Sequence, residues 1–179
     1  STGRAIYHTW AMIAEATSVR AWAYPEVIWH CQEMCSAPMH AVQDNQGVFH
    51  IVYTERAGDC RYLKWSPKHQ TLHGPMTVSS VSKGTTAYLP RVAVGQDGSI
   101  HVVWTETRLP NGPTLRVCYA RSGDNGSTWS ALQLAGQFHS DANVVITEDQ
   151  TVHLLWNGGV GAGRRYYQCS HDGGHSWWP

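Results

Sequence analysis

Short apolar runs recur along this sequence, and each follows a polar turn and ends in an aromatic residue. Residues 47–53, 98–104 and 150–156 form three closely similar runs, and residues 4–10 form a looser fourth. Apolar runs of this length, bounded by Gly, Asp and Asn, are typical of β-strands joined by tight turns. The pattern therefore predicts an all-β fold built from repeated strand units.

The aromatic residues that end these runs are regularly spaced. Tyr53, Trp104 and Trp156 are separated by 51 and 52 residues, and Trp10 precedes Tyr53 by 43 residues. β-Propeller blades, which have four antiparallel strands, repeat about every 40–50 residues. With each run as a second strand, we expect first strands at residues 40–42, 91–94 and 143–146, third strands at 61–64, 115–121 and 164–169, and a fourth strand at 129–134.

The predicted blades divide the chain into four parts. These are a partial, degenerate blade at residues 1–36, two complete blades at 37–88 and 89–138, and a truncated blade at 139–179. Roughly three and a half to four blades are expected, so a closed ring needs more. Either the remaining blades belong to a longer chain or two or more copies assemble. We favour the longer chain, because open sheet edges promote aggregation.

A second motif follows the third strand of two units. Residues 122–129 match S-x-D-x-G-x-T-W, and residues 170–177 match it with Ser at the Thr position. In such a turn the Asp carboxylate accepts backbone N–H groups, the Gly adopts a conformation closed to other residues, and the Trp packs on the sheet. We therefore assign a structural role to Ser122, Asp124, Gly126, Thr128 and Trp129 and to Ser170, Asp172, Gly174, Ser176 and Trp177.

These residues resemble the Asp-box, or BNR, repeats of the sialidase (neuraminidase) superfamily, over roughly residues 38–179. In the unit at 37–88 the box is eroded, since residues 65–70 contain neither Asp nor Gly. The resemblance implies a sialidase-like propeller, most often six-bladed, with the Asp boxes at the outer rim and away from the substrate pocket.

The resemblance also implies a catalytic set: three Arg that bind the substrate carboxylate, a Tyr–Glu nucleophile and an Asp acid/base. The first Arg of that set lies in an Arg-Ile-Pro-like motif, which this sequence lacks; residues 89–92, Leu-Pro-Arg-Val, have a different order. Glu55 and Glu106 occupy equivalent positions after two second strands, which favours a feature of the repeat over a catalytic role. We therefore predict no catalytic residue.

Ligand contacts are expected where the inner strands of a propeller begin and where their loops meet the channel. The alternative is that these residues merely line solvent-facing loops. Surface Trp and Tyr would stack on sugar rings. The candidate ligand-binding residues are His40, Arg91, Arg108, His139, Asp141 and Asn143.

Composition narrows the function further. There are 13 basic and 13 acidic residues, so the net charge is zero and no basic face indicates nucleic-acid binding. No apolar stretch is long enough to predict a membrane span. The sequence contains five Cys. A zinc site could use Cys31 and Cys35 with His30, but the sequence offers no second pair of ligands to complete it. Buried thiols with one disulfide are therefore favoured. We expect no metal and no cofactor, and we interpret the recurring His50, His101 and His153 as packing residues.

Two functions remain open. The first is a non-catalytic module that binds a glycan or another protein, in an extracellular, periplasmic or cell-surface location. The second is a fragment of an exo-sialidase or related glycoside hydrolase whose catalytic residues lie partly outside this chain. The missing Arg-Ile-Pro motif and the eroded Asp box favour the first.

Overall fold

The computed structural model describes residues 4–31, 36–55, 58–109, 112–158 and 163–179, and the chain divides into two units, Ser1–Cys35 and Ser36–Pro179. In the smaller unit β1 (Ala5–His8) pairs antiparallel with β2 (Glu26–His30). Two short 3-10 helices, η1 (Ile13–Glu15) and η2 (Val19–Ala21), lie between these strands in the sequence. The strand expected at residues 4–10 corresponds to β1. Cys31 is in a disulfide, and Cys35 lies outside the described residues.

In the larger unit the described residues form three antiparallel sheets, each with its strands hydrogen-bonded in chain order. The first sheet contains β3 (Ser36–Gln43), β4 (Phe49–Thr54), β5 (Cys60–Ser66) and β6 (Thr71–Ser79). The second contains β7 (Thr85–Val94), β8 (Ile100–Arg108), β9 (Thr114–Ser122) and β10 (Ser130–Ala135). The third contains β11 (His139–Ile146), β12 (Val152–Gly158) and β13 (Arg164–Ser170), and a bridge from Cys169 to Trp178 extends it. The predicted all-β class and antiparallel strand order are confirmed.

The first strands of the second and third sheets begin earlier than the sequence pattern predicted. The pairing register of β7 shifts between Tyr88 and Arg91, and that of β11 shifts between Ser140 and Asn143. At each shift one residue adopts a left-handed conformation, Leu89 with φ 50° and Asp141 with φ 53°. These bulges interrupt the alternation of apolar and polar residues, so the pattern showed only the part of each strand that follows the bulge.

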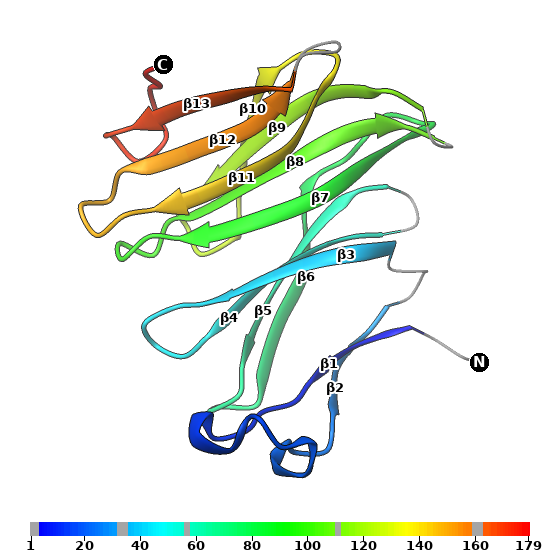
Figure 1. Ribbon diagram of the computed structural model, residues 1–179, viewed down its shortest axis with the longest axis vertical. Helices are drawn as coiled ribbons and strands as arrows, with labels where there is room; N and C mark the ends of the chain where they lie inside the picture. Colours follow the sequence, from blue (N-terminus) through cyan, green and yellow to red (C-terminus); the bar gives the residue numbers. More distant parts are fainter. Residues whose placement is uncertain (1–3, 32–35, 56–57, 110–111, 159–162) are drawn as a thin grey trace. The chain divides into compact units, whose positions relative to one another are not determined.

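Consecutive sheets of the larger unit pack against each other (Figure 1). Strand β7 contacts β3 and β4 of the first sheet, and β11 contacts β7, β8 and β9 of the second. The first interface buries Val52 and Tyr62 together with Val102 and Trp104. The second buries, among others, Val103, Tyr119, Val144, Leu154 and Trp156. Two separate apolar cores therefore hold three sheets in sequence.

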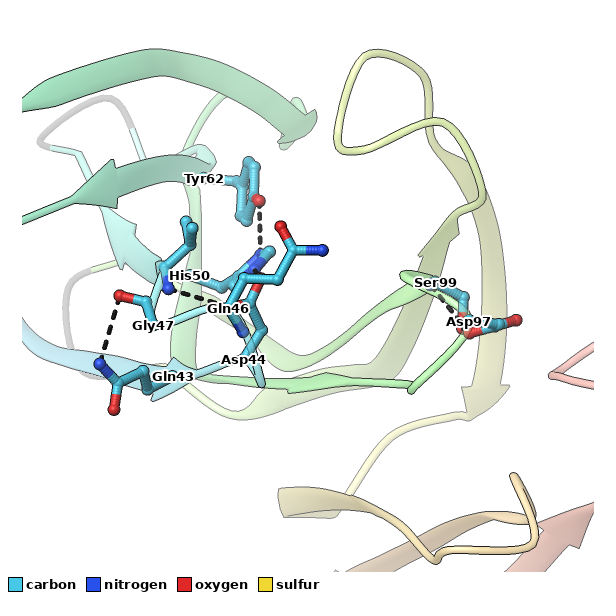
Figure 2. A network of polar contacts seen from close by, with 9 residues as sticks. Gln43, Asp44, Gln46, Gly47, His50, Tyr62, Asp97 and Ser99 are labelled. Atoms are coloured by element: carbon cyan, nitrogen blue, oxygen red, sulfur yellow. Dashed lines mark hydrogen bonds and ion pairs between the residues drawn. The ribbon is translucent and has the colours of Figure 1, made fainter. Parts of the chain in front are cut away.

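A histidine–tyrosine pair recurs in all three sheets. In each, the Nδ1 atom of a second-strand His is hydrogen-bonded to the hydroxyl of a third-strand Tyr: His50 to Tyr62 (2.7 Å), His101 to Tyr119 (2.7 Å) and His153 to Tyr167 (2.8 Å). Figure 2 shows the first pair, in which Asp44 lies 3.1 Å from the other ring nitrogen. The part of the chain that the structure describes contains no cluster of metal-ligating side chains. The recurring histidines are thus built into the sheets.

Each Asp box closes its own turn through the Asp carboxylate. Asp124 Oδ1 accepts hydrogen bonds from the Thr128 N–H (2.9 Å) and the Ser122 hydroxyl (2.8 Å), and Oδ2 accepts one from the Thr128 hydroxyl (2.6 Å). These bonds, that of the Thr128 hydroxyl foremost, lower the pKa of Asp124 to about 2. Asp172 accepts the equivalent bonds from Ser176 and Ser170, which also lower its pKa.

The Asp boxes also contact the preceding sheet. The Trp129 ring packs edge-on against Tyr62 of the first sheet, with centroids 5.3 Å apart, and Trp177 packs in the same way against Tyr119 of the second, at 5.0 Å. Gly126 approaches Tyr62 so closely that a Cβ would lie 2.5 Å from its Cε1 atom. Each Asp box therefore fastens its sheet to the sheet before it, which adds a role to the predicted hairpin.

Candidate functional site

A cleft of about 690 Å³ opens at the edge of the second sheet where β7 begins, β8 ends and β9 begins. The turn before β7 meets the β8–β9 hairpin there, with Gln137 from the connection that follows β10. The lining residues are Ser82, Lys83, Gly84, Thr85, Glu106, Arg108, Leu109, Leu115, Arg116 and Gln137.

The floor of the cleft contains a buried carboxylate. Glu106 is 3% exposed; its Oε1 accepts a hydrogen bond from the Thr85 hydroxyl (3.1 Å) and its Oε2 accepts one from Arg116 Nε (2.5 Å). The bond to Glu106 raises the pKa of Arg116. Arg116 therefore balances the charge of Glu106.

The rim of the cleft is cationic. Lys83 and Arg108 are both exposed, and Glu106 is the one carboxylate among the described residues that line the cleft. Because Arg116 already balances Glu106, the Lys83 and Arg108 charges remain for a ligand. The described residues that line the cleft include no aromatic side chain, so they offer a ligand charge and hydrogen bonds but no ring to stack on.

Backbone bonds fix the rim in place. The Leu109 N–H donates to the Gly84 carbonyl (2.8 Å), which ties the end of β8 to the turn before β7. Within that turn the Ser82 carbonyl accepts the Thr85 N–H (3.0 Å) and shares the single Thr85 hydroxyl proton with Glu106, at 2.7 Å from the hydroxyl oxygen. A cleft held in this way loses little freedom when a ligand binds.

A second, smaller hollow of about 400 Å³ lies along the first strands of the three sheets. It is lined mainly by apolar residues of β3, β7 and β11, with His40, Gln43 and Asn143 as its polar side chains. His40 Nδ1 accepts a hydrogen bond from the Val92 N–H (3.3 Å), and burial, with the nearby Arg91 charge, lowers the pKa of His40. The imidazole is thus occupied in joining two strands.

The predicted ligand-binding residues do not converge on one site. Arg108 lines the cleft, whereas His40 and Asn143 line the smaller hollow. The other three contact neighbouring groups: Arg91 donates to the Pro90 carbonyl (3.3 Å), His139 accepts the Trp156 indole N–H (3.0 Å), and Asp141 accepts the Asn157 amide (3.0 Å).

The sequence pattern missed Lys83, Arg116 and Gln137 as cleft residues. They lie in no motif and come together only when β7, β9 and the loop after β10 are in place. Glu106 was interpreted as a feature of the repeat, and its counterpart Glu55 does pair with Arg61 (2.8 Å) in the first sheet. One available signal was that charged residues continue β8 beyond the aromatic anchor Trp104 as far as Arg108.

No protein-family model and no curated protein matches the sequence. Its fold is similar to a protein of unknown function from Dyadobacter fermentans DSM 18053, at 17% identity and TM-score 0.66, over 88% of this chain and 53% of that chain. It is also similar to a polysaccharide lyase of family PL25, an ulvan lyase bound to -[GlcA(1-4)Rha3S]-, at 15% identity and TM-score 0.60, over 77% of this chain and 36% of that chain. A GH43_1 enzyme from Xanthomonas citri complexed with xylotriose matches at 16% identity and TM-score 0.51, over 73% and 42%.

At these identities the similarity shows the fold alone. The chain spans about a third to a half of the length of these three proteins. No helix in the described residues is long and apolar enough to cross a membrane.

Proposed function

We propose that this chain is a non-catalytic, sialidase-like Asp-box β-propeller module that acts outside the cytoplasm and binds an anionic glycan in the cleft of the second sheet. One observation carries the proposal: Lys83 and Arg108 stand exposed on a fixed rim, while Glu106 is neutralised by Arg116 beneath them. Carboxylate or sulfate groups on a sugar would pair with those two cations.

The fold comparisons support a glycan as the ligand. The ulvan lyase is bound to -[GlcA(1-4)Rha3S]-, and the GH43_1 enzyme is complexed with xylotriose. Glycan-acting proteins thus use a similar arrangement of sheets. The two Asp boxes, each closed by its own carboxylate, support the sialidase-like assignment.

Hydrolysis by these residues is not favoured. Most glycoside hydrolases use a pair of carboxylates about 5–10 Å apart, and sialidases use a Tyr–Glu nucleophile with an Asp acid/base. Among the described residues lining the cleft, Glu106 is the one carboxylate, and it is held by Arg116 and Thr85. The second candidate, a fragment of an exo-sialidase or related hydrolase, is kept because the chain spans only part of its structural neighbours.

The test compares binding of uronic-acid and sulfated oligosaccharides with binding of their neutral counterparts by calorimetry. Lys83→Ala and Arg108→Ala are each expected to weaken anionic binding by about 10-fold or more, because each removes a charge-assisted hydrogen bond worth about 1.5–3 kcal/mol. Lys68→Ala is the matched control, since Lys68 is an exposed lysine in the turn before β6 and does not line the cleft. Two results contradict the proposal: neutral sugars bind as tightly as anionic ones, or neither Lys83→Ala nor Arg108→Ala weakens binding of the anionic sugars. Turnover of a fluorogenic sialoside supports the hydrolase instead.

A further inference from the structure

The third sheet exposes a face that is buried in the other two sheets. Tyr167 occupies the position of Tyr62 and Tyr119, yet it is 46% exposed, whereas those residues are 0% and 2% exposed. Leu155 is 46% exposed where its counterparts Val52 and Val103 are both 0% exposed.

The same difference extends to the first strand. Val145, which pairs with His153, is 49% exposed, whereas Ala93, which pairs with His101, is 9% exposed. Three apolar side chains on adjacent strands of one sheet are therefore open together. We call the surface of Val145, Leu155 and Tyr167 the Tyr167 face.

In the first two sheets, the next sheet and its Asp box cover this surface. Tyr62 contacts Trp129 and lies against Gly126, and Tyr119 contacts Trp177 and lies against Gly174. Gly126 and Gly174 have φ values of 88° and 91°, so both boxes present the same conformation to their tyrosine. The molecule thus contains two occupied copies of one docking site.

The third copy is already in the docking arrangement. The His153 and Tyr167 ring centroids are 5.9 Å apart, as are those of His50–Tyr62 and His101–Tyr119. The hydrogen bond within the pair is 2.8 Å, against 2.7 Å in the occupied copies. The two rings are inclined at 28°, against 39° and 45° in the occupied copies, so docking on the Tyr167 face requires only a small change in their angle.

We propose that the Tyr167 face binds a further Asp-box repeat that lies outside these 179 residues. Its occupant would present a left-handed Gly to Tyr167 and, three residues later, a Trp that packs edge-on against the same ring. A second copy of this chain has no free Asp box to present to Tyr167, because both of its boxes are engaged with its own Tyr62 and Tyr119. The proposal rests on the sheet interfaces and does not depend on glycan binding.

Cys169 provides a probe of this docking. It lies opposite His153 in the β12–β13 register and is partly exposed, whereas Cys60 and Cys118 are buried and Cys31 is in a disulfide. Arg121 occupies the matching position of the second sheet, and its side chain lies beside Gly174 of the docked Asp box. A Cβ added to Gly174 would be 3.6 Å from the Arg121 Cδ atom. A docked repeat should therefore cover the Cys169 thiol.

The experiment extends the full chain by one repeat in phase. The sequence of residues 130–179 is placed directly after Trp177, as it follows Trp129 in the native chain, and the added copy of Cys169 is changed to Ser. The rate at which Cys169 reacts with a thiol reagent is expected to fall at least 10-fold relative to the native chain. An extended chain whose Cys169 reacts as fast as in the native chain overturns the proposal.

Two variants separate docking from a general effect of added chain. Changing Gly174 to Val and Trp177 to Ala in the added repeat only should restore the native reaction rate. In the 179-residue chain, Tyr167→Ala should lower the denaturant midpoint much less than Tyr119→Ala, because Tyr167 keeps its contact with His153 but has no docked Asp box against it. Equal lowering by both substitutions contradicts the assignment of Tyr167 as an open docking position.

Discussion

The close approach of an Asp-box glycine to a tyrosine of the preceding sheet predicts a large effect of adding one methyl group. In Gly174→Ala the new Cβ would lie 2.0 Å from the Tyr119 hydroxyl oxygen. That hydroxyl is hydrogen-bonded to the buried His101 and has little room to withdraw. The interface between the second and third sheets must therefore open or the turn must distort.

The magnitude follows from two separable costs. Alanine in a left-handed conformation costs about 1–2 kcal/mol, and overpacking of a filled interface costs about 1–3 kcal/mol more. Gly98 is the matched control, because it has a similar φ of 81° but no atom within 4 Å of its added Cβ. Gly98→Ala should lower the free energy of unfolding by about 1–2 kcal/mol and Gly174→Ala by about 2–5 kcal/mol.

Equilibrium urea denaturation followed by tryptophan fluorescence measures both changes. A Gly174→Ala effect within about 0.5 kcal/mol of the Gly98→Ala effect would refute the reasoning, because only the conformational cost would then remain. A double-mutant cycle with Tyr119→Phe adds a check. Since the hydroxyl is the atom nearest the new Cβ, the two substitutions should be coupled, with Gly174→Ala costing less when the hydroxyl is absent.

Three further predictions concern charge. Burial, together with the nearby Arg121 charge, lowers the pKa of His101 to about 4. Between about pH 6.5 and pH 4 the unfolded chain therefore binds a proton that the native chain does not, and the free energy of unfolding should fall by roughly 3 kcal/mol as the pH is lowered across that window. A free energy of unfolding that does not change with pH in this window contradicts the prediction. Asp124→Asn should lower the denaturant midpoint at pH 7, and the difference from the native chain should vanish as the pH falls through about 2, where Asp124 itself is protonated. Glu106→Gln should lower the free energy of unfolding by only about 1–2 kcal/mol, because solvent weakens an ion pair whose Arg116 is 41% exposed. The same substitution should tighten binding of an anionic glycan, because it frees the Arg116 charge. Unchanged or weaker binding counts against the proposed role of the cleft.

Local features could be predicted from the sequence. The second strands were recognisable because each contains an apolar run that follows a turn and ends in an aromatic anchor, and β8 and β12 contain Trp104 and Trp156 in their expected runs. The antiparallel order followed from the short connections between successive predicted strands within each unit. All of these signals lie within a few residues of each other in the chain.

Features that depend on tertiary packing could not be predicted in the same way. The contact between Trp129 and Tyr62 joins residues of different sheets, and nothing near either residue in the sequence indicates the other. The cleft likewise combines Lys83, Arg108 and Arg116 from segments that carry no motif. The bulge at Leu89 concealed the beginning of β7, because an extra residue breaks the alternation on which strand prediction rests.

The location of a bound anionic glycan tests the proposed function most directly. An amide NMR titration of the isotopically labelled chain with a sulfated or uronic-acid oligosaccharide reports which residues the ligand approaches. We predict saturable shift changes at Lys83, Gly84, Arg108, Leu109 and Arg116, which line the cleft, and their loss in Arg108→Ala. Shifts centred instead on His40 and Asn143 in the smaller hollow, or no saturable shifts, would contradict the account.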